Sequence, residues 1–351
     1  MFCFFHRNWK RQAMVCIILH SMVITLGAGE QVEIADSPQL PIEVKSKVFQ
    51  ANLSNLSPED YRFTVLRLIA QLENEQKFKI KPSVFPQIAI KFDAQRAPGL
   101  STNPNLLFSL VQFLERRGYT RENIFLVALK IDRETRFTLE KQFLASQIIT
   151  GEDEEYFHPD WFHDSPMPPA MGYRAKLLID NPQNPEKRKI EERKSYLPAF
   201  LFLSKMHWIN LSTAKDDHVL GIDGAITNAT LNSSSNSQRF REDSTIGPAA
   251  ATEILAIPEF SEKQLFSVLD LSEMQIAGGP EFNAEFIRHK PSLLLSKNPV
   301  FIDYYAMQSI QKERAILALK DRVPQDCKLF IYARELGLGD IQETELVQLA
   351  D

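Results

Sequence analysis

Residues 205–232, KMHWINLSTAKDDHVLGIDGAITNATLN, concentrate side chains that could do chemistry. His207 and His218 bracket most of the stretch, and Asp216, Asp217 and Asp223 stand close by. Imidazole and carboxylate groups gathered on a loop suit zinc, manganese or non-haem iron, and they also serve as proton donors and acceptors. The alternative is a strand and a loop that are polar without forming a site.

A second group of such side chains occurs in YFHPDWFHD, which contains His158 and His163 together with Asp160 and Asp164. This pair of histidines is the better candidate for a divalent metal ion, because it lies in a segment without helical or strand periodicity. Neither pair has the i, i+4 spacing of two ligands on one helix. In a segment rich in aromatic residues and proline, packing or hydrogen bonding is the simpler role for both histidines.

Lys91 ends a predicted strand, and Asp93 follows two residues later. In open α/β sheets, ligands bind at the carboxyl ends of parallel strands. The sequence STNPNLL then opens a helix, whose free N–H groups and the hydroxyl of Ser101 or Thr102 could hold an anion. The alternative is that one of these two hydroxyls only caps the helix.

Two further segments carry candidate residues. In IAGGPEF, Gly278 and Gly279 follow a strand, where glycine permits either a tight turn or a close approach of backbone to a ligand. In NPVFIDYYA, Asp303 lies among apolar residues in the first turns of a predicted helix. A buried carboxylate needs a partner, although compensation of the charge at the helix start is the simpler account.

Several familiar chemistries lack their usual motifs. The sequence contains no dinucleotide-binding G-x-G-x-x-G after a strand, no P-loop, no G-x-S-x-G and no H-E-x-x-H. Cys3 and Cys16 lie near the start of the chain, which leaves Cys327 as the single cysteine of the remainder. A zinc site or iron–sulfur cluster built from the chain's own thiolates is therefore excluded, and Cys327 is expected to be a buried structural residue.

The first 29 residues have the pattern of a secretory signal peptide: basic residues, an apolar run from Met14 to Leu26, and small residues at the end. Cleavage there would leave 37 Lys and Arg against 45 Asp and Glu. An acidic balance argues against nucleic acid as a partner, and no later segment is long and apolar enough to cross a membrane. We expect an exported protein, periplasmic or extracellular; an uncleaved N-terminal anchor is the alternative.

Residues 30–351 are expected to form a single α/β domain. Strand-like and helix-like patterns alternate in the first half, with helices over about 57–75, 101–118 and 134–149 and strands over 41–50, 85–93 and 122–130. This order implies a mostly parallel sheet flanked by helices. Later segments add a helix near 247–255 and another from about residue 298.

The middle of the chain does not follow this alternation. Residues 151–171 combine acids, aromatic residues and prolines, which predicts a long loop or flap, and residues 181–195 predict a solvated, charged connection. The apolar run 196–205 is expected to be a strand that leads into residues 205–232, and Cys327 precedes another strand-like run. The fold therefore carries a large loop-rich middle insertion.

Six segments in a fixed order resemble the uncharacterised, mainly prokaryotic family known as domain of unknown function 362. The segments, which cover about residues 40–310, are IKFD, STNPNLLFSLVQFLERRGY, SKMHW, VLGIDGAITN, VLDLSEMQIAGGP and LLLSKNPVFIDYYA. The family has a Lys-x-His motif at a strand end in the third segment. The resemblance implies that the polar residues of interest are Lys91, Thr102, Lys205, His207, Asn228, Gly279 and Asp303.

The sequence departs from the family pattern at three positions. Asp93 stands where the family usually has asparagine, Thr227 where a lysine is expected, and Asn298 where aspartate is usual. Threonine cannot replace an ammonium, which puts any step that needs that charge in doubt. Many relatives also carry ferredoxin-like cysteine repeats, and this chain has none, so it has no iron–sulfur cluster of its own.

Two functions follow from these observations. The first is an enzyme of unknown reaction, with Lys205, His207 and Asp303 as catalytic residues and Lys91, Thr102, Asn228 and Gly279 as ligand-binding residues in a polar cleft at the strand ends. The segment of His158 and His163 would form its lid. The second is a non-catalytic periplasmic protein that binds a small anionic or polar ligand in the same cleft. The sequence gives no oligomeric state.

Overall fold

The structure is a computed structural model that describes residues 46–94, 99–143, 147–167, 169–203 and 205–350. All of these residues belong to one compact unit, Val44–Asp351. The proposed signal peptide, residues 1–29, lies outside the described residues.

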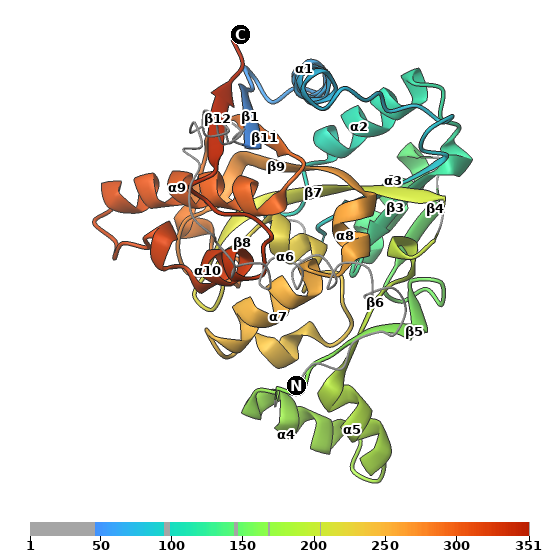
Figure 1. The fold of residues 1–351 in the computed structure, drawn as a ribbon, viewed down its shortest axis with the longest axis vertical. Coiled ribbons are helices and arrows are strands. Elements are labelled where there is room, and N and C mark those ends of the chain that lie inside the picture. Colours follow the sequence, from blue (N-terminus) through green and yellow to red (C-terminus); the bar gives the residue numbers. More distant parts are fainter. Residues whose placement is uncertain (1–45, 95–98, 144–146, 168, 204, 351) are drawn as a thin grey trace, which may run out of the picture. The chain divides into compact units, whose positions relative to one another are not determined.

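A ten-stranded sheet forms the centre of the fold, as Figure 1 shows. Its main path runs β12-β1-β11-β9-β7-β2-β3-β4, with the short strands β8 and β10 attached to β7 and β9. The strands are β1 (Ser46–Asn52), β2 (Gln87–Phe92), β3 (Ile124–Ala128), β4 (Gln147–Thr150), β7 (Met206–Asp217), β8 (Gly221–Asp223), β9 (Gln264–Gln275), β10 (Ile287–Arg288), β11 (Ser292–Ser296) and β12 (Thr344–Gln348).

The predicted fold class, α/β with a mostly parallel sheet, is confirmed. Strands β9, β7, β2, β3 and β4 pair in parallel, whereas β11 runs antiparallel to both β9 and β1. The first two strands of the chain are not neighbours, because β7, β9 and β11 lie between β1 and β2. The strands β2 and β7 are almost entirely buried, as strands covered on both faces should be.

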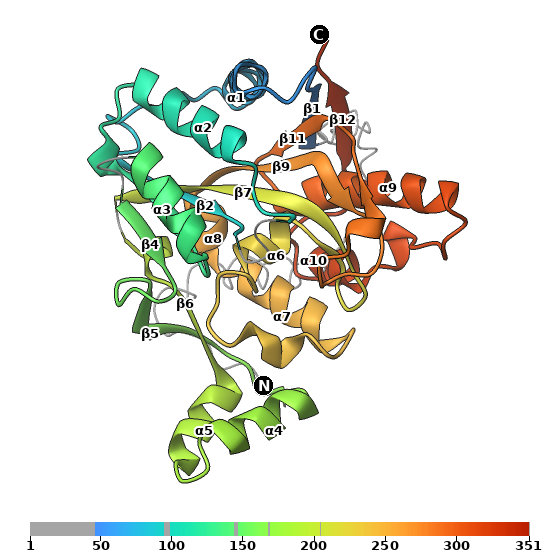
Figure 2. The same ribbon diagram turned by 180° about the vertical axis from the view of Figure 1, so that it is seen from behind.

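Helices cover both faces of the sheet, which Figures 1 and 2 show from opposite sides. On one face lie α1 (Pro58–Gln76), α2 (Pro104–Arg116) and α3 (Arg133–Gln142), whose apolar side chains join one core cluster. On the other lie α6 (Ala225–Ala229), α7 (Ile246–Leu255), α8 (Pro258–Lys263), α9 (Pro299–Ile316) and α10 (Lys328–Glu335), which share a second cluster. Two cores on opposite faces make a three-layer fold.

Two predicted elements are shorter than expected or of another type. The helix expected over residues 134–149 ends at Gln142, and the β-branched residues of Gln147–Thr150 instead pair with β3 as strand β4. The run after Cys327 was expected to be a strand and is the helix α10. A short apolar run does not distinguish a buried strand from a buried helix turn, which explains the second error.

The middle insertion contains more regular structure than the sequence predicts. Part of the expected loop at 151–171 forms strand β5 (Phe157–Asp164), which pairs with β6 (Lys194–Pro198) as a separate antiparallel ribbon. Two helices, α4 (Met171–Asp180) and α5 (Pro185–Arg193), connect these strands. The apolar run 196–205 is not one strand, because β6 ends at Pro198 and a 3-10 turn, Ala199–Leu201, follows.

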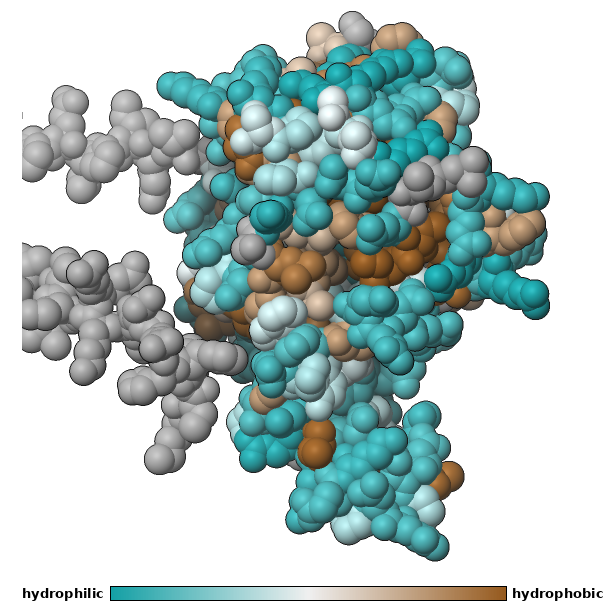
Figure 3. Space-filling view, turned by 90° about the vertical axis from the view of Figure 1, so that its right-hand side faces the viewer, coloured by the Kyte–Doolittle hydropathy of each residue, from teal (hydrophilic) through white to brown (hydrophobic). Residues whose placement is uncertain are grey.

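The hairpin of α4 and α5 projects from the sheet and has a mainly hydrophilic surface, at the bottom of Figure 3. The expected solvated connection at 181–195 is thus largely α5, a helix without a buried side chain. Isolated apolar residues are exposed on the hairpin, among them Met171 and Ile179. In the part of the chain that the structure describes, no helix combines the length and the apolar character needed to span a bilayer.

Candidate functional site at the carboxyl edge of the sheet

Two of the predicted ligand-binding residues, Lys91 and Asn228, meet at the carboxyl edge of the sheet. Lys91, near the end of β2, donates a hydrogen bond from Nζ to Oδ1 of Asn228 at 2.8 Å and a second to the carbonyl of Phe92 at 3.1 Å. Asn228 lies in the short helix α6 and is held in place by its own bonds to Asn210 Oδ1, at 2.7 Å, and to the carbonyl of Leu211. Both side chains are 1% exposed.

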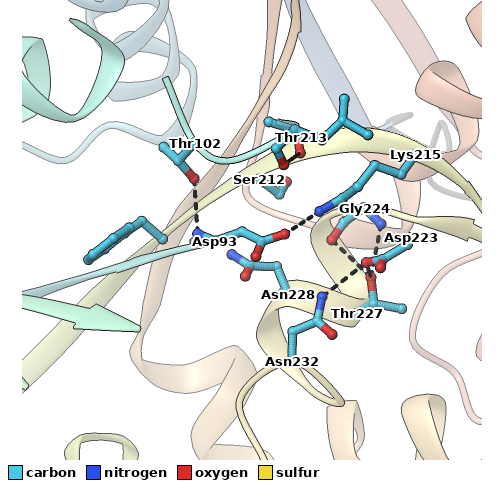
Figure 4. Close-up of polar contacts among 12 residues, drawn as sticks. Asp93, Thr102, Ser212, Thr213, Lys215, Asp223, Gly224, Thr227, Asn228 and Asn232 are labelled. Atoms are coloured by element: carbon cyan, nitrogen blue, oxygen red, sulfur yellow. Dashed lines mark hydrogen bonds and ion pairs between the residues drawn. The ribbon is translucent and has the colours of Figure 1, made fainter. Parts of the chain in front are cut away.

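A second lysine, Lys215, completes this group from the neighbouring strand. Lys215 lies late in β7, and its ammonium forms an ion pair with Asp93, the residue after β2 (Figure 4). Thr102 fixes Asp93 from the other side, because the Thr102 hydroxyl accepts from the Asp93 N–H at 2.9 Å. Two ammonium groups and a carboxylate from adjacent parallel strands are thus buried together where open α/β sheets place their ligands.

Residue 227, where the family resemblance predicts lysine, has a structural role in this chain. The Thr227 hydroxyl donates to Asp223 Oδ1 and accepts from the Gly224 N–H at 2.9 Å. Asn232 donates to the same Asp223 oxygen at 3.0 Å, and Figure 4 shows both side chains turned toward it. Thr227 therefore fixes the turn between β8 and α6, and Lys91 and Lys215 supply the ammonium groups here. We call Lys91, Asp93, Lys215, Asp223, Thr227 and Asn228 the carboxyl-edge cluster.

Burial shifts the pKa of two groups in the carboxyl-edge cluster. Burial and the neighbouring charge of Lys215 together lower the pKa of Lys91 to about 8, against the opposing effects of Asp93 and Asp223. For Asp93, burial alone would raise the pKa, but the adjacent Lys215 ammonium outweighs burial and holds the pKa below its ordinary value. A lysine that loses its proton near neutral pH can act as a base, which an exposed lysine cannot do.

Asp303, a predicted catalytic residue, caps a helix. It extends from α9 to the start of α6, where its carboxylate accepts from the N–H groups of Ala225 at 2.5 Å and Ile226 at 2.8 Å. Burial raises the pKa of Asp303 to about 7, although these two hydrogen bonds favour the ionised form. Asp303 therefore holds the helix that carries Asn228, and it occupies the helix start where an anion could otherwise bind.

The two other predicted catalytic residues, Lys205 and His207, lie at the opposite edge of the sheet. The resemblance predicts that they end a strand, and this prediction is wrong, because β7 begins at Met206. His207 pairs in register with Ile88, near the start of β2, and its ring packs on Phe85 with a centroid distance of 4.7 Å. Burial and the charge of Lys263 lower the pKa of His207. Lys205 is exposed at this amino edge.

Thr102 and Gly279 contact the protein's own backbone. Thr102 does not cap α2; Asn103 does, by accepting from the Asn105 N–H. Gly279 packs so closely on β7 that a Cβ there would overlap the Asp216 carbonyl oxygen and lie 2.7 Å from its carbonyl carbon. Glycine at position 279 thus permits a close approach of its own backbone to the backbone of β7.

His158 and His163, the predicted metal ligands, have different partners although both lie in β5. The ring of His158 packs on Trp161 with a centroid distance of 4.5 Å, whereas His163 Nε2 lies 3.0 Å from Glu253 Oε2 of α7. Within the described ranges, no three His, Cys, Asp or Glu side chains are grouped so that they could hold a metal ion. The divalent metal remains a prediction.

A hollow of about 470 Å³ lies away from the carboxyl-edge cluster, between the end of α1 and the start of β2. Its lining includes Lys77, Lys79 and Lys81, which belong to the same amino-edge side as Phe85 and His207. The carboxyl-edge cluster is instead covered: Thr213 Oγ1 donates to the Leu100 carbonyl at 3.1 Å, which fastens the segment before α2 to β7.

Sequence reasoning did not select Lys215, and it named Asp223 only as one of the carboxylates close to His207 and His218. Both stand in residues 205–232, but the long strand β7 is buried on both faces, so no alternation marks which of its polar residues point to the cluster. A signal was present: Lys215 follows a run of uncharged residues that is too polar for a simple core strand. A buried lysine of this kind needs a partner.

Comparison with known proteins does not assign this chain to a family. The sequence matches no family model, and no curated protein shows significant similarity to it. The function is therefore inferred from the residues of this chain.

Proposed function

We propose that the protein is an enzyme that uses a lysine-dependent proton transfer on a small polar or anionic substrate at the carboxyl-edge cluster. Lys91 would act as the acid–base group, and the Lys215–Asp93 pair would bind and orient the substrate. The observation that carries this proposal is the burial of Lys91 and Lys215 together at the ends of adjacent parallel strands, where burial lowers the pKa of Lys91 to about 8.

Access to the cluster would require movement of the segment Gly99–Thr102. This segment is held by the Thr213–Leu100 hydrogen bond and by contact of Gly99 with the ring of Phe282, where a Cβ on Gly99 would lie 2.6 Å from the ring. Thr102 adds hydrogen bonds to the backbone of Asp93 and to the Leu211 carbonyl, and these would also have to break for the segment to open. A substrate that enters would then meet Thr102, Asp93 and the two lysines.

Lys91→Met should abolish turnover, because methionine has a similar length but can neither gain nor lose a proton. The measurement is incubation of wild type and variant with pools of small polar metabolites, with conversion followed by mass spectrometry. Wild-type turnover should rise with pH through about 8, since a base must be neutral to accept a proton.

Lys290→Met is the matched control for this experiment. Lys290 is also partly buried, burial also lowers its pKa, and it donates to Ser309 outside the cluster, so its loss should leave turnover and its pH profile unchanged. Turnover that persists in Lys91→Met would place the chemistry elsewhere and reject this function.

A non-catalytic binding protein is the second candidate. It is favoured by the fixed hydrogen-bond network in which Asn210 holds Asn228 and Asn228 holds Lys91, since such preorganised polar groups suit recognition without reaction. A compound that raises the melting temperature of wild type but not of Lys91→Met, and is recovered unchanged, would support this candidate over the enzyme.

We further propose export and a distant relationship to the domain of unknown function 362. Export is supported by the basic, apolar and small-residue pattern of residues 1–29. The relationship is supported by six motifs in order, and within them by Lys91 and Asn228, which lie in different motifs and are in contact.

A further inference from the structure

A fully buried arginine beside the middle insertion lacks partners for most of its donors. Arg239 lies in the 3-10 turn Ser237–Phe240 and is 0% exposed. Its Nη2 donates to the carbonyl of Ser165 at 3.3 Å, whereas its Nε and Nη1 have no hydrogen-bond partner. No carboxylate of the described residues forms an ion pair with it.

A second unpartnered nitrogen belongs to a side chain that packs on the same aromatic ring. The guanidinium of Arg239 stacks on the ring of Phe240, with Cζ at 4.5 Å from the centroid, and the ring of His163 packs against Phe240 at 6.4 Å. His163 bonds Glu253 through Nε2, but its buried Nδ1 has no partner. Ser165, which Arg239 reaches, is two residues beyond His163. Nitrogens of both side chains are therefore left unsatisfied around one aromatic ring.

The acidic groups near Arg239 are already paired with other arginines. Asp164 accepts from Arg193 Nε at 3.0 Å and from its Nη2 at 3.1 Å, and Glu192 lies 3.8 Å from Arg174. Burial lowers the pKa of Arg239 to about 10, which leaves it charged at neutral pH. A buried cation without a counter-charge is strongly unfavourable, and so the site lacks one negative charge.

We propose that Arg239 and His163 form a binding site for a small oxyanion: a carboxylate, sulfate or phosphate. Oxygen atoms of the anion would accept from Nε and Nη1 of Arg239, and also from Nδ1–H of His163 when its imidazole is doubly protonated, because Nε2–H already donates to Glu253. The positive charge of Arg239 favours an anion at His163 over the divalent cation that the sequence suggests. This site is independent of the carboxyl-edge cluster and of its proposed chemistry.

The proposed anion site lies next to the base of the α4–α5 hairpin. The N–H of Ala170, the residue before α4, donates to the carbonyl of Arg239 at 3.1 Å, and Tyr173 of α4 contributes to the electrostatic environment of the guanidinium. An anion bound at Arg239 would therefore stabilise the base of the α4–α5 hairpin, which projects below the sheet in Figure 1.

The test is the melting temperature of the full chain in formate, acetate, sulfate or phosphate, each compared with sodium chloride at equal ionic strength. Binding to the folded state alone should raise the melting temperature of wild type by roughly 2 °C when the anion is at about five times its Kd, and further as its concentration increases. Sulfate and phosphate also stabilise proteins by exclusion from their surface, so Arg239→Met supplies the baseline. Methionine removes the unpaired charge and keeps much of the volume, and this variant should show no specific response.

Arg188→Met is the matched control, because it removes a guanidinium of the same α4–α5 hairpin that donates to the backbone carbonyls of Asn181 and Pro182. It should retain the wild-type response. If Arg239→Met does not fold, wild type alone decides: stabilisation by a site follows RT ln(1 + [L]/Kd) and bends to a logarithmic rise once the anion exceeds its Kd, whereas exclusion grows linearly with concentration. A strictly linear response, or one equal in wild type and Arg239→Met, would show that no anion binds at Arg239 and would overturn the proposal.

Discussion

Burial gives single polar side chains of this protein their chemical character. Lys91, Asp303 and Arg239 are all nearly or fully inaccessible, and burial moves the pKa of each toward its neutral form. Their partners differ: Lys91 bonds an amide and a carbonyl, Asp303 bonds two N–H groups, and Arg239 leaves two nitrogens unbonded. Lys91 is therefore suited to proton transfer, Asp303 holds a helix, and Arg239 is suited to binding a ligand.

Asp303→Asn should change the pH dependence of stability. The pKa of Asp303 is about 7 in the folded protein against an ordinary value of 3.8, so the folded state holds this proton more tightly. Its contribution to stability is therefore complete below about pH 4 and is lost as the pH rises through about 7. From pH 4 to pH 8, the free energy of unfolding of wild type should fall relative to Asp303→Asn, by up to about 4 kcal/mol. Urea denaturation across this pH range measures the difference.

Asp243→Asn is the control with the opposite sign. Asp243 is exposed and accepts from the N–H groups of Thr245 and Ile246 at the start of α7, and these bonds lower its pKa. The contribution of Asp243 to the free energy of unfolding is present at neutral pH and is lost as the pH falls through the acid range. A wild-type-to-Asp303→Asn difference that does not vary with pH would show that Asp303 is ionised throughout.

At the scale of elements, the strand β7 organises the molecule. It lies in the middle of the sheet, carries Asn210 and Lys215 to the carboxyl-edge cluster, and carries Asp216 and Asp217 to arginines from later segments. Periodicity and cap residues predict α1, α2 and α9 from the sequence, because each shows a helix start of Ser or Asn followed by Pro.

Other elements could not be predicted in this way. The ribbon of β5 and β6 forms only when two segments about thirty residues apart pair, and neither has strict alternation. The start of β7 was misplaced because the apolar run before it resembles a strand, while the 3-10 turn Ala199–Leu201 separates the two. Within the candidate site, a predicted strand end and the motifs of the family resemblance predict Lys91 and Asn228. The Lys215–Asp93 ion pair depends on the pairing register of β2 and β7, which cannot be read from the sequence.

Gly279→Ala should destabilise the packing of the turn against β7. A methyl group at Gly279 would overlap backbone atoms of Asp216, which cannot move without shifting the strand. We expect a loss of roughly 3 kcal/mol in the free energy of unfolding, the range of severe overpacking, measured by urea denaturation.

Gly337→Ala separates this steric effect from backbone strain. Gly337 has a φ of +71°, but a Cβ there meets no atom within 4 Å, so only the cost of a left-handed conformation remains, about 1 kcal/mol. Equal losses for the two variants would mean that β7 shifts easily to accept the methyl group at Gly279.

At the scale of the whole molecule, the sheet separates two apolar cores that stabilise one compact unit. Several of its buried charged side chains, among them Lys91, Lys215 and Asp303, lie at or beside the carboxyl edge, whereas Glu73 and Asp270 are buried on the side of α1. The charged groups at the carboxyl edge are those on which the proposed function rests.

Processing of the chain tests the proposed export. When the full chain is expressed in a bacterium, intact-mass spectrometry of the periplasmic fraction should find a protein that begins near residue 30, because the apolar run from Met14 to Leu26 is too short to anchor the chain in a bilayer. Ile18→Arg would place a charge inside this run and should keep the uncleaved chain in the cytoplasm, whereas Ile18→Leu should leave export unchanged. Full-length wild type in the cytoplasm would refute export, and full-length wild type in the membrane fraction would refute cleavage. Because the cleaved segment carries three basic residues and no acidic one, the mature protein would have a formal charge of −8, and its migration at neutral pH should shift accordingly.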